Sequence, residues 1–155
     1  MTAAELHVER VRDADEAHVA ALSRLLPQLS STAPAPGADE LAHLLDPAGP
    51  IRLFAARLHE APDDPGRLVG YAVLVVFTSL TGTRGWVEDV VVDEAARNHG
   101  VGTRLVERLV EAATEEGCRT LDLTSRPARE AANRLYARCG FLRRDTNVWR
   151  HDLHP

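Results

Sequence analysis

The sequence contains no lysine, although basic residues are not scarce. All 18 of its basic residues are arginines, which excludes enzymes that form a Schiff base through a lysine. It also excludes a P-loop, in which a lysine contacts the bound phosphates. The dinucleotide-binding pattern G-x-G-x-x-G is missing as well, so neither common nucleotide-binding fingerprint is present.

Long apolar runs are absent too. A membrane-spanning helix needs about 18 consecutive apolar residues, whereas the longest candidate, residues 68–77, is interrupted by Gly70 and is typical of a strand. The first 12 residues include Glu5 and Glu9 and lack the apolar core of a signal peptide. We therefore expect a cytoplasmic protein that is not integral to a membrane.

Cysteine is scarce, and acidic residues outnumber basic ones. Cys118 and Cys139 are the only cysteines, which is too few for a disulfide framework and includes no C-x-x-C metal or redox motif. We expect both to be reduced core residues, and we expect no metal. The formal net charge of −5 argues against a nucleic-acid partner, because phosphate binding relies on clustered basic residues.

What the sequence does contain is typical of one globular domain, residues 1–155. With 45% apolar residues, a chain of this length can bury a core without disulfides or metals. Hydrophobic periodicity and turn residues predict strands at 6–12, 51–58, 68–77, 84–93 and 119–124, helices at 16–29, 39–45, 101–116 and 127–138, and a final hairpin at 141–153. Short turns between the three central strands predict an antiparallel meander. The helix that follows it implies one parallel strand pairing.

The strongest predicted helix begins after a turn that contains glycine. Residues 97–102, R-N-H-G-V-G, follow the apolar segment at 90–92. Backbone N–H groups at a helix N-terminus are unsatisfied and carry roughly +0.5 charge, so this turn suits a pyrophosphate. Gly100 and Gly102 leave room for a phosphate, and Asn98 tolerates a left-handed conformation. A tight strand-to-helix connection without a ligand explains the same turn equally well.

A second motif lies farther along the chain. R-x-x-G-x-G follows W-V-E-D-V-V-V-D, and N-x-x-Y-x-x-x-G-F supplies Asn133, Tyr136, Gly140 and Phe141. Together, over about residues 86–153, these motifs resemble the GNAT family of N-acetyltransferases. The resemblance implies an α+β fold, with a mixed, mostly antiparallel twisted sheet of about seven strands that is splayed in the middle and flanked by about four helices. Acetyl-CoA would lie in the wedge, and an amine would arrive from the other side.

The resemblance also assigns cofactor contacts. The backbone groups of Val90, Val91 and Val92 would pair with the pantetheine arm, and Asn133 would hold the cofactor. The pyrophosphate turn falls on Arg97, Asn98, His99, Gly100, Val101, Gly102 and Thr103. Family members usually have glycine at the position of Asn98. Because asparagine can adopt the same φ, we expect binding to survive.

The resemblance places Tyr136 beside the cofactor sulfur, where a phenol could serve as an acid. Tyrosine stays protonated at neutral pH and can donate to the departing thiolate, although a packed helix-face aromatic fits the same spacing. The amine must lose a proton, and Glu88 is the first candidate for the base. Asp89 faces the opposite side of a strand unless a bulge intervenes, and the resemblance implies such a bulge. Backbone N–H groups near Val90 would then stabilise the oxyanion.

The predicted function is transfer of an acetyl group from acetyl-CoA directly to a primary amine of a small molecule. A protein lysine or N-terminal acetyltransferase, or a non-catalytic module that binds acetyl-CoA, remains an alternative. The sequence leaves open the acceptor and whether Glu88, Asp89 or a water chain is the base. Family members often dimerise, so a homodimer also stays open.

Overall fold

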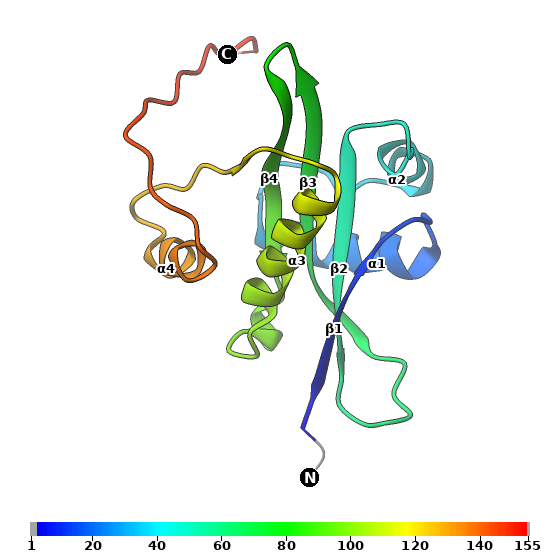
Figure 1. Cartoon of the computed structure of the whole chain (residues 1–155). Coiled ribbons are helices and arrows are strands. Elements are labelled where there is room, and N and C mark those ends of the chain that lie inside the picture. Colours follow the sequence, from blue (N-terminus) through cyan, green and yellow to red (C-terminus); the bar gives the residue numbers. More distant parts are fainter. Residues whose placement is uncertain (1–2, 155) are drawn as a thin grey trace.

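The framework of the protein is a five-stranded sheet with strand order β1-β2-β3-β4-β5. It is seen in a computed structural model that describes residues 3–154 (Figure 1). The strands are β1 (Glu5–Arg10), β2 (Ile51–His59), β3 (Arg67–Ser79), β4 (Gly82–Val92) and β5 (Leu121–Asp122). The first four pair antiparallel, and β5 pairs parallel to β4. The predicted α+β class, the meander and the single parallel pairing are confirmed, with five strands where about seven were expected.

Helices cover both faces of this sheet. They are α1 (Glu16–Leu25), α2 (Ala38–Leu44), α3 (Val101–Glu115) and α4 (Glu130–Arg138), with 3-10 turns η1 (Leu26–Gln28) and η2 (Glu94–Ala96). α3 lies on one face, and α1 and α2 lie on the other (Figure 1). Asp15 caps α1 by accepting the His18 N–H at 2.8 Å, and α1 gives way to η1 at Pro27. α3 ends before Gly117, whose φ of 74° marks the predicted left-handed stop.

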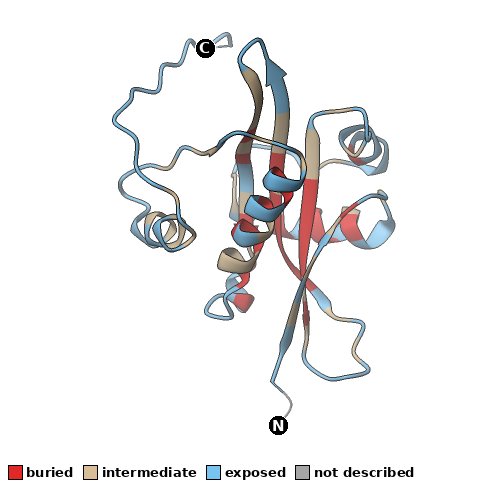
Figure 2. Ribbon diagram, in the orientation of Figure 1, coloured by how far each residue is buried: buried red, intermediate tan, exposed pale blue. Residues whose placement is uncertain are grey.

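Two apolar clusters form the core, one on each face of the sheet (Figure 2). Alternate side chains of a strand point to opposite faces, so β2 sends Phe54 toward α3 and Leu53 toward α1. Leu105 of α3 is fully buried in the first cluster, and Leu25 of α1 is fully buried in the second. α4 has no buried residue and lies beside α3 rather than on the sheet. In the part of the chain that the structure describes, no helix is long and apolar enough to cross a membrane.

The predicted start of the helix at 127 is wrong by three residues. Pro127 instead occupies the second position of a turn, which the Arg129 N–H closes on the Arg126 carbonyl at 3.0 Å. Arg129 has a non-helical ψ of 63°, so α4 begins at Glu130. The strand predicted at 119–124 is likewise shorter, because only Leu121 and Asp122 pair with β4 in register.

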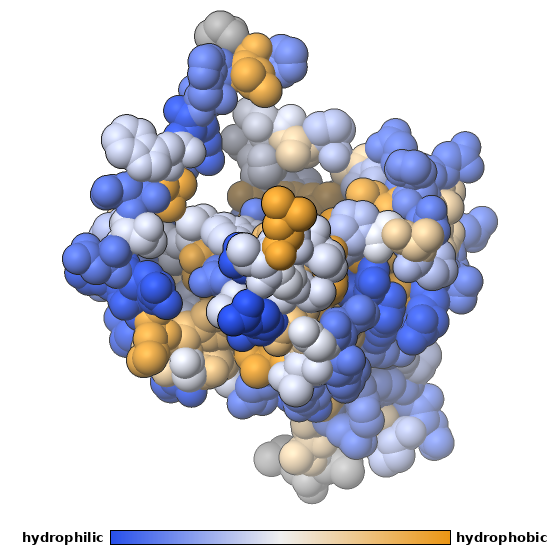
Figure 3. Space-filling view, turned by 45° about the horizontal axis from the view of Figure 1, so that its top comes forward, coloured by the Kyte–Doolittle hydropathy of each residue, from blue (hydrophilic) through white to orange (hydrophobic). Residues whose placement is uncertain are grey.

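The hairpin predicted at residues 141–153 is also wrong, since this segment forms no strand. Its D-T-N turn contains no glycine, which tight hairpins favour, and the two-residue β5 offers little edge on which another strand could pair. Phe141 packs against the core, but the other four large apolar side chains of the segment are 72–88% exposed: Leu142, Val148, Trp149 and Leu153. In Figure 3 this segment projects from the body of the molecule.

Candidate active site

A β-bulge shapes the end of β4. In the ladder with β3, Tyr71 pairs with Val91 and Val73 pairs with Glu88. β4 therefore contains one more residue than β3 between these two pairs. Asp89 takes up the bulge with a φ of 51°. The bulge that the family resemblance implied is therefore present. Since β5 pairs with β4 only at Gly85 and Trp86, residues 90–92 have no β5 partner in register.

A cleft of about 550 Å³ lies beside this unpaired end of β4. Its walls come from β4, from η1, from the start of α3 and from α4 with the turn before it. Its lining residues are Gln28, Leu29, Val90, Val91, Val92, Arg97, Gly102, Ala128, Arg129, Glu130, Ala131, Ala132, Arg134, Leu135 and Tyr136. The wedge expected from the family resemblance is thus a real cavity, although α4 rather than a long β5 forms its second wall.

The turn before α3 has the conformation of an anion-binding turn. Asn98 and Gly100 both have left-handed φ, at 70° and 72°, so Asn98 does adopt the left-handed conformation expected of it. Gly100 is the N-cap of α3, and no side chain caps this helix in the described chain. A Cβ added at Gly100 would meet no other side chain or distant backbone within 4 Å. The first N–H groups of α3 are therefore available to a phosphate, which the helix dipole favours.

Gly102 allows the two helices that flank the cleft to approach each other closely. A Cβ at this position would lie 2.9 Å from Leu135 Cδ1 of α4, well inside the normal carbon contact distance of about 3.5–4.0 Å. Both residues line the cleft. A side chain at position 102 would therefore push into the cavity or displace Leu135.

Arginines give the cleft a positive lining although the whole chain carries a formal charge of −5. Arg97, Arg129 and Arg134 line the cleft together with one carboxylate, Glu130. Glu130 lies 4.0 Å from Arg134 and Glu94 lies 3.8 Å from Arg97, so among the described residues only Arg129 of the three has no carboxylate partner. Guanidinium groups bind phosphates well, and the lining suits a polyphosphate ligand.

Tyr136 lies in the lining of the cleft, as its predicted role requires. Burial raises the pKa of its phenol above the ordinary value, so the hydroxyl carries its proton at neutral pH. Its ring packs edge-on against Phe141 with centroids 6.0 Å apart, and the Phe141 N–H bonds the Tyr136 carbonyl at 3.0 Å. The two aromatic residues of the second motif therefore hold each other in place.

Two other predicted residues lie away from the cleft lining. Asn133 donates its side-chain N–H to the Arg126 carbonyl at 3.0 Å, which ties α4 to the turn before it. Glu88 is exposed, and its Oε1 accepts the Trp86 indole N–H at 2.9 Å. Glu88 does not line the cleft. If Glu88 acts as the base, the amine must therefore approach it from outside the cleft.

The predicted turn residues differ in where they lie relative to the cleft. Arg97 and Gly102 line the cleft, whereas Asn98, His99, Gly100 and Thr103 do not, and Val101 is buried in the core. The His99 ring lies 3.3 Å from the Arg97 carbonyl. Sequence reasoning missed the η1 wall, Gln28 and its neighbour Leu29, because nothing in their local pattern shows that Gln28 contacts the segment directly after β4.

The cysteines offer no nucleophile to this site. Both are free and half-buried, and burial raises the pKa of each thiol, which disfavours the reactive thiolate. Within residues 3–154 no three His, Cys, Asp or Glu side chains gather in a way that could hold a metal ion.

Comparison with known proteins decides the family. The model of the acetyltransferase (GNAT) family matches residues 20–141. The chain belongs to the GNAT family. A glucosamine 6-phosphate N-acetyltransferase of Trypanosoma brucei brucei is 31% identical over 134 residues, which are 84% of this chain and 87% of that protein. Another of Oryza sativa is 38% identical over 114 residues, or 72% of this chain. That match spans only 59% of the rice protein, and a match to a second rice relative, a probable glucosamine 6-phosphate N-acetyltransferase, spans 39% of it.

A solved GNAT structure agrees with this result over nearly the whole chain. A crystal structure of a Trypanosoma brucei acetyltransferase superposes with a TM-score of 0.73 at 28% identity, covering 96% of this chain and all of the other. GNAT enzymes take the acetyl group from acetyl-CoA, and the cleft fits that molecule. It combines an uncapped helix N-terminus, arginines for the phosphates and an unpaired strand end for an amide-containing arm.

Proposed function

We propose that this chain is an N-acetyltransferase that transfers an acetyl group from acetyl-CoA directly to a primary amine of a small molecule. The observation that carries the proposal is the cleft between β4 and α4, which combines an uncapped helix N-terminus with a protonated tyrosine. Gly102, in the first turn of α3, and Tyr136 line the same cavity. A single thioester cofactor could contact both.

Acetyl-CoA, when bound, supplies an acetyl group activated as a thioester. The Tyr136 hydroxyl donates its proton to the departing sulfur. Glu88 accepts the proton that the amine loses as its nitrogen bonds to the acetyl carbon, either directly or through a water molecule. The Val90 N–H, which belongs to a residue skipped in the β3–β4 ladder, donates to the acetyl carbonyl oxygen.

The roles of cofactor-binding residues follow from their places in the site. Val90, Val91 and Val92 would hold the pantetheine arm along the unpaired end of β4, and Arg97 with the N–H groups of α3 would hold the phosphates. Asn133 would act indirectly, because its side chain holds the turn before α4.

An amino sugar phosphate is the first acceptor to test. Two relatives that match most of this chain are named for glucosamine 6-phosphate, which is a primary amine on a small, anionic ring. The acidic composition of the chain instead favours a cationic amine without a phosphate group. The relatives and the composition therefore predict different substrates. A peptide N-terminus or a protein lysine is the third class.

The first experiment is thermal unfolding with acetyl-CoA, CoA, ATP and NADH in parallel. A ligand at about 100 times its Kd adds about 2.7 kcal/mol to the stability of the folded state. We expect stabilisation by acetyl-CoA and CoA alone. If neither raises the melting temperature, the proposal is wrong.

The second experiment follows CoA release with glucosamine 6-phosphate, unphosphorylated glucosamine, a polyamine and an N-terminal peptide. Turnover with any of the small amines would support the proposed enzymatic activity, and the relative rates would rank the acceptors. Acetyl-CoA binding without turnover on any of them would favour the non-catalytic alternative. Glu88→Gln should lower kcat without weakening acetyl-CoA binding, because Glu88 lies outside the cleft lining. Unchanged turnover would remove Glu88 as the base.

We further propose that the chain forms a homodimer in the cytoplasm. Four large apolar side chains exposed within residues 142–153 are more than a monomer normally presents on so short a segment, and two free thiols suit a reducing compartment. Light scattering of the wild type and Trp149→Arg tests the dimer. A wild type that is already monomeric would contradict it.

A further inference from the structure

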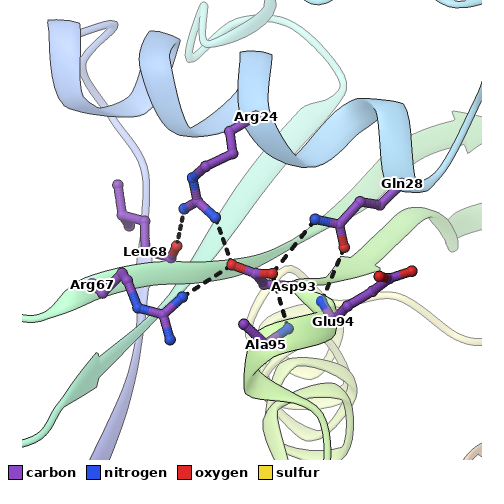
Figure 4. A network of polar contacts seen from close by, with 7 residues as sticks. All are labelled: Arg24, Gln28, Arg67, Leu68, Asp93, Glu94 and Ala95. Atoms are coloured by element: carbon purple, nitrogen blue, oxygen red, sulfur yellow. Dashed lines mark hydrogen bonds and ion pairs between the residues drawn. The ribbon is translucent and has the colours of Figure 1, made fainter.

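A buried carboxylate links separate elements at the point where β4 ends. The Asp93 side chain is only 8% exposed, and both of its oxygens accept hydrogen bonds (Figure 4). Oδ2 accepts from Arg24 at 2.5 Å and from Arg67 at 3.0 Å. Oδ1 accepts from the Ala95 N–H at 3.1 Å and, at 3.5 Å, from Gln28.

The donors come from four different elements. Arg24 belongs to α1, Gln28 to η1, Arg67 to β3 and Ala95 to η2. Two of them make a second bond that reinforces the first. Arg24 also donates to the Leu68 carbonyl at 2.6 Å, and Gln28 Oε1 accepts the Glu94 N–H at 3.0 Å. We refer to this set of contacts as the Asp93 network.

The network connects two walls of the cleft. Gln28 and its neighbour Leu29 line one wall. Asp93 leads into the other, because it caps η2, and η2 is followed directly by Arg97, which also lines the cleft. The η1 and η2 turns are only three residues long each, so the side-chain bonds of the network add to the backbone bond from the Asp93 N–H to the Val69 carbonyl at 2.8 Å in fixing their relative position.

Ionisation strengthens the network. Burial alone would raise the pKa of Asp93, but the Ala95 N–H, Arg24 and Gln28 together outweigh it and hold the pKa below its ordinary value. The carboxylate therefore carries its charge at neutral pH between two arginines. Hydrogen bonds between charged partners are roughly twice as strong as neutral ones.

We propose that Asp93 is a positioning residue that couples the η1 wall of the cleft to the phosphate turn, so that the cleft is held open in the form that binds acetyl-CoA. The residue touches neither reacting group. Its loss should lower the fraction of molecules in the binding-competent form, and the apparent Kd rises as the inverse of that fraction. The cofactor part of this inference rests on the proposed function.

The test compares Asp93→Asn with a matched control, Glu116→Gln. Glu116 is also a carboxylate between two arginines, accepting from Arg52 at 2.7 Å and lying 3.9 Å from Arg10, but it lies just past the C-terminal end of α3, away from the cleft. Gln28→Leu is a milder second variant on an exposed residue, so it should fold even if Asp93→Asn does not.

Two measurements are made on each full-length variant. Amide hydrogen exchange without ligand should be faster in Asp93→Asn at residues 26–37 and 94–100 together. Acetyl-CoA Kd should rise about tenfold in Asp93→Asn and about threefold in Gln28→Leu, with kcat at saturating acetyl-CoA within about twofold of wild type. Glu116→Gln should change neither segment and leave Kd as in wild type.

Several results would overturn the proposal. Faster exchange at 94–100 with none at 26–37 would show that the two walls are independent. A Kd unchanged in both Asp93→Asn and Gln28→Leu, or raised equally in Glu116→Gln, would reduce the network to general stability. If the wild type failed to bind acetyl-CoA, the proposed function would be wrong, while the exchange data alone would still confirm or overturn the coupling.

Discussion

Gly102→Ala should change ligand binding in the cleft much more than it changes the stability of the fold. The new Cβ would lie 2.9 Å from Leu135 Cδ1 and 3.7 Å from Val92 Cγ2. Leu135 must therefore move by roughly 0.6 Å or more to restore a normal contact. Because all three residues line the cleft, the added methyl group and the displaced leucine both reduce its volume.

The stability effect should be small because two terms oppose each other. Alanine is favoured over glycine within a helix by at most about 1 kcal/mol. Crowding in a packed region costs about 1–3 kcal/mol, at the low end here because the contacted atom is the end of a flexible side chain. We expect the free energy of unfolding to change by no more than about 1 kcal/mol.

Ligand binding should respond much more. If the bound cofactor blocks the relaxation of Leu135, the full crowding cost appears on binding, and about 1.4 kcal/mol corresponds to a tenfold rise in Kd. Isothermal titration with acetyl-CoA and denaturant unfolding measure the two quantities on the same sample. Gly117→Ala is the control: its φ of 74° makes alanine cost about 1–2 kcal/mol, at the far end of α3. Wild-type Kd in Gly102→Ala would refute the placement of the cofactor in this cleft.

Three further predictions follow from single residues. Tyr136→Phe should lower kcat by about 10²- to 10⁴-fold with little change in acetyl-CoA Kd; steady-state kinetics and titration decide, and unchanged turnover would remove the acid role. Burial raises the pKa of Tyr71 far above its ordinary value, so its contribution to stability is complete below about pH 10 and falls as pH rises beyond it. Tyr71→Phe should flatten that alkaline loss in denaturant unfolding, while it costs about 1–3 kcal/mol at neutral pH by leaving the buried His18 Nδ1 without its 2.9 Å partner; an equally steep alkaline loss would contradict this. Asp89→Gly should keep the bulge and the activity, whereas Asp89→Val should lose about 1–2 kcal/mol and slow turnover, because valine is strained at a φ of 51°; equal behaviour of the two variants would show that the bulge is unimportant.

Sequence reasoning worked best where structure depends on neighbours along the chain. Val101–Glu115 carries its apolar residues on one face and stops at Gly117, and the helix forms there. Asn98 was expected to accept a left-handed φ, and it does. Sequence reasoning failed at the C-terminal segment. A strand there needs the edge of the sheet as a partner, and the edge strand β5 is only two residues long.

The candidate site divides in the same way. The turn before α3 and Tyr136 can be found from the sequence, because a glycine-containing turn marks the first and a short motif marks the second. Gln28 and Leu29 cannot, because they reach the cleft only when α1 packs across the sheet onto the end of β4. The same holds for the Asp93 network, in which the three side chains that donate to Asp93 are 26 to 69 residues away in sequence.

The sequence by itself thus determined the order of the elements as far as α4, the antiparallel meander, the left-handed turn before α3 and the family. These depend on periodicity, on turn residues and on backbone preferences that act over a few positions. The tertiary structure alone decided where β4 separates from β5, which distant residues line the cleft beside it, and which carboxylate links η1 to η2. Those features depend on contacts between distant segments, and no local pattern records which distant side chain will complete a hydrogen bond or fill a cavity.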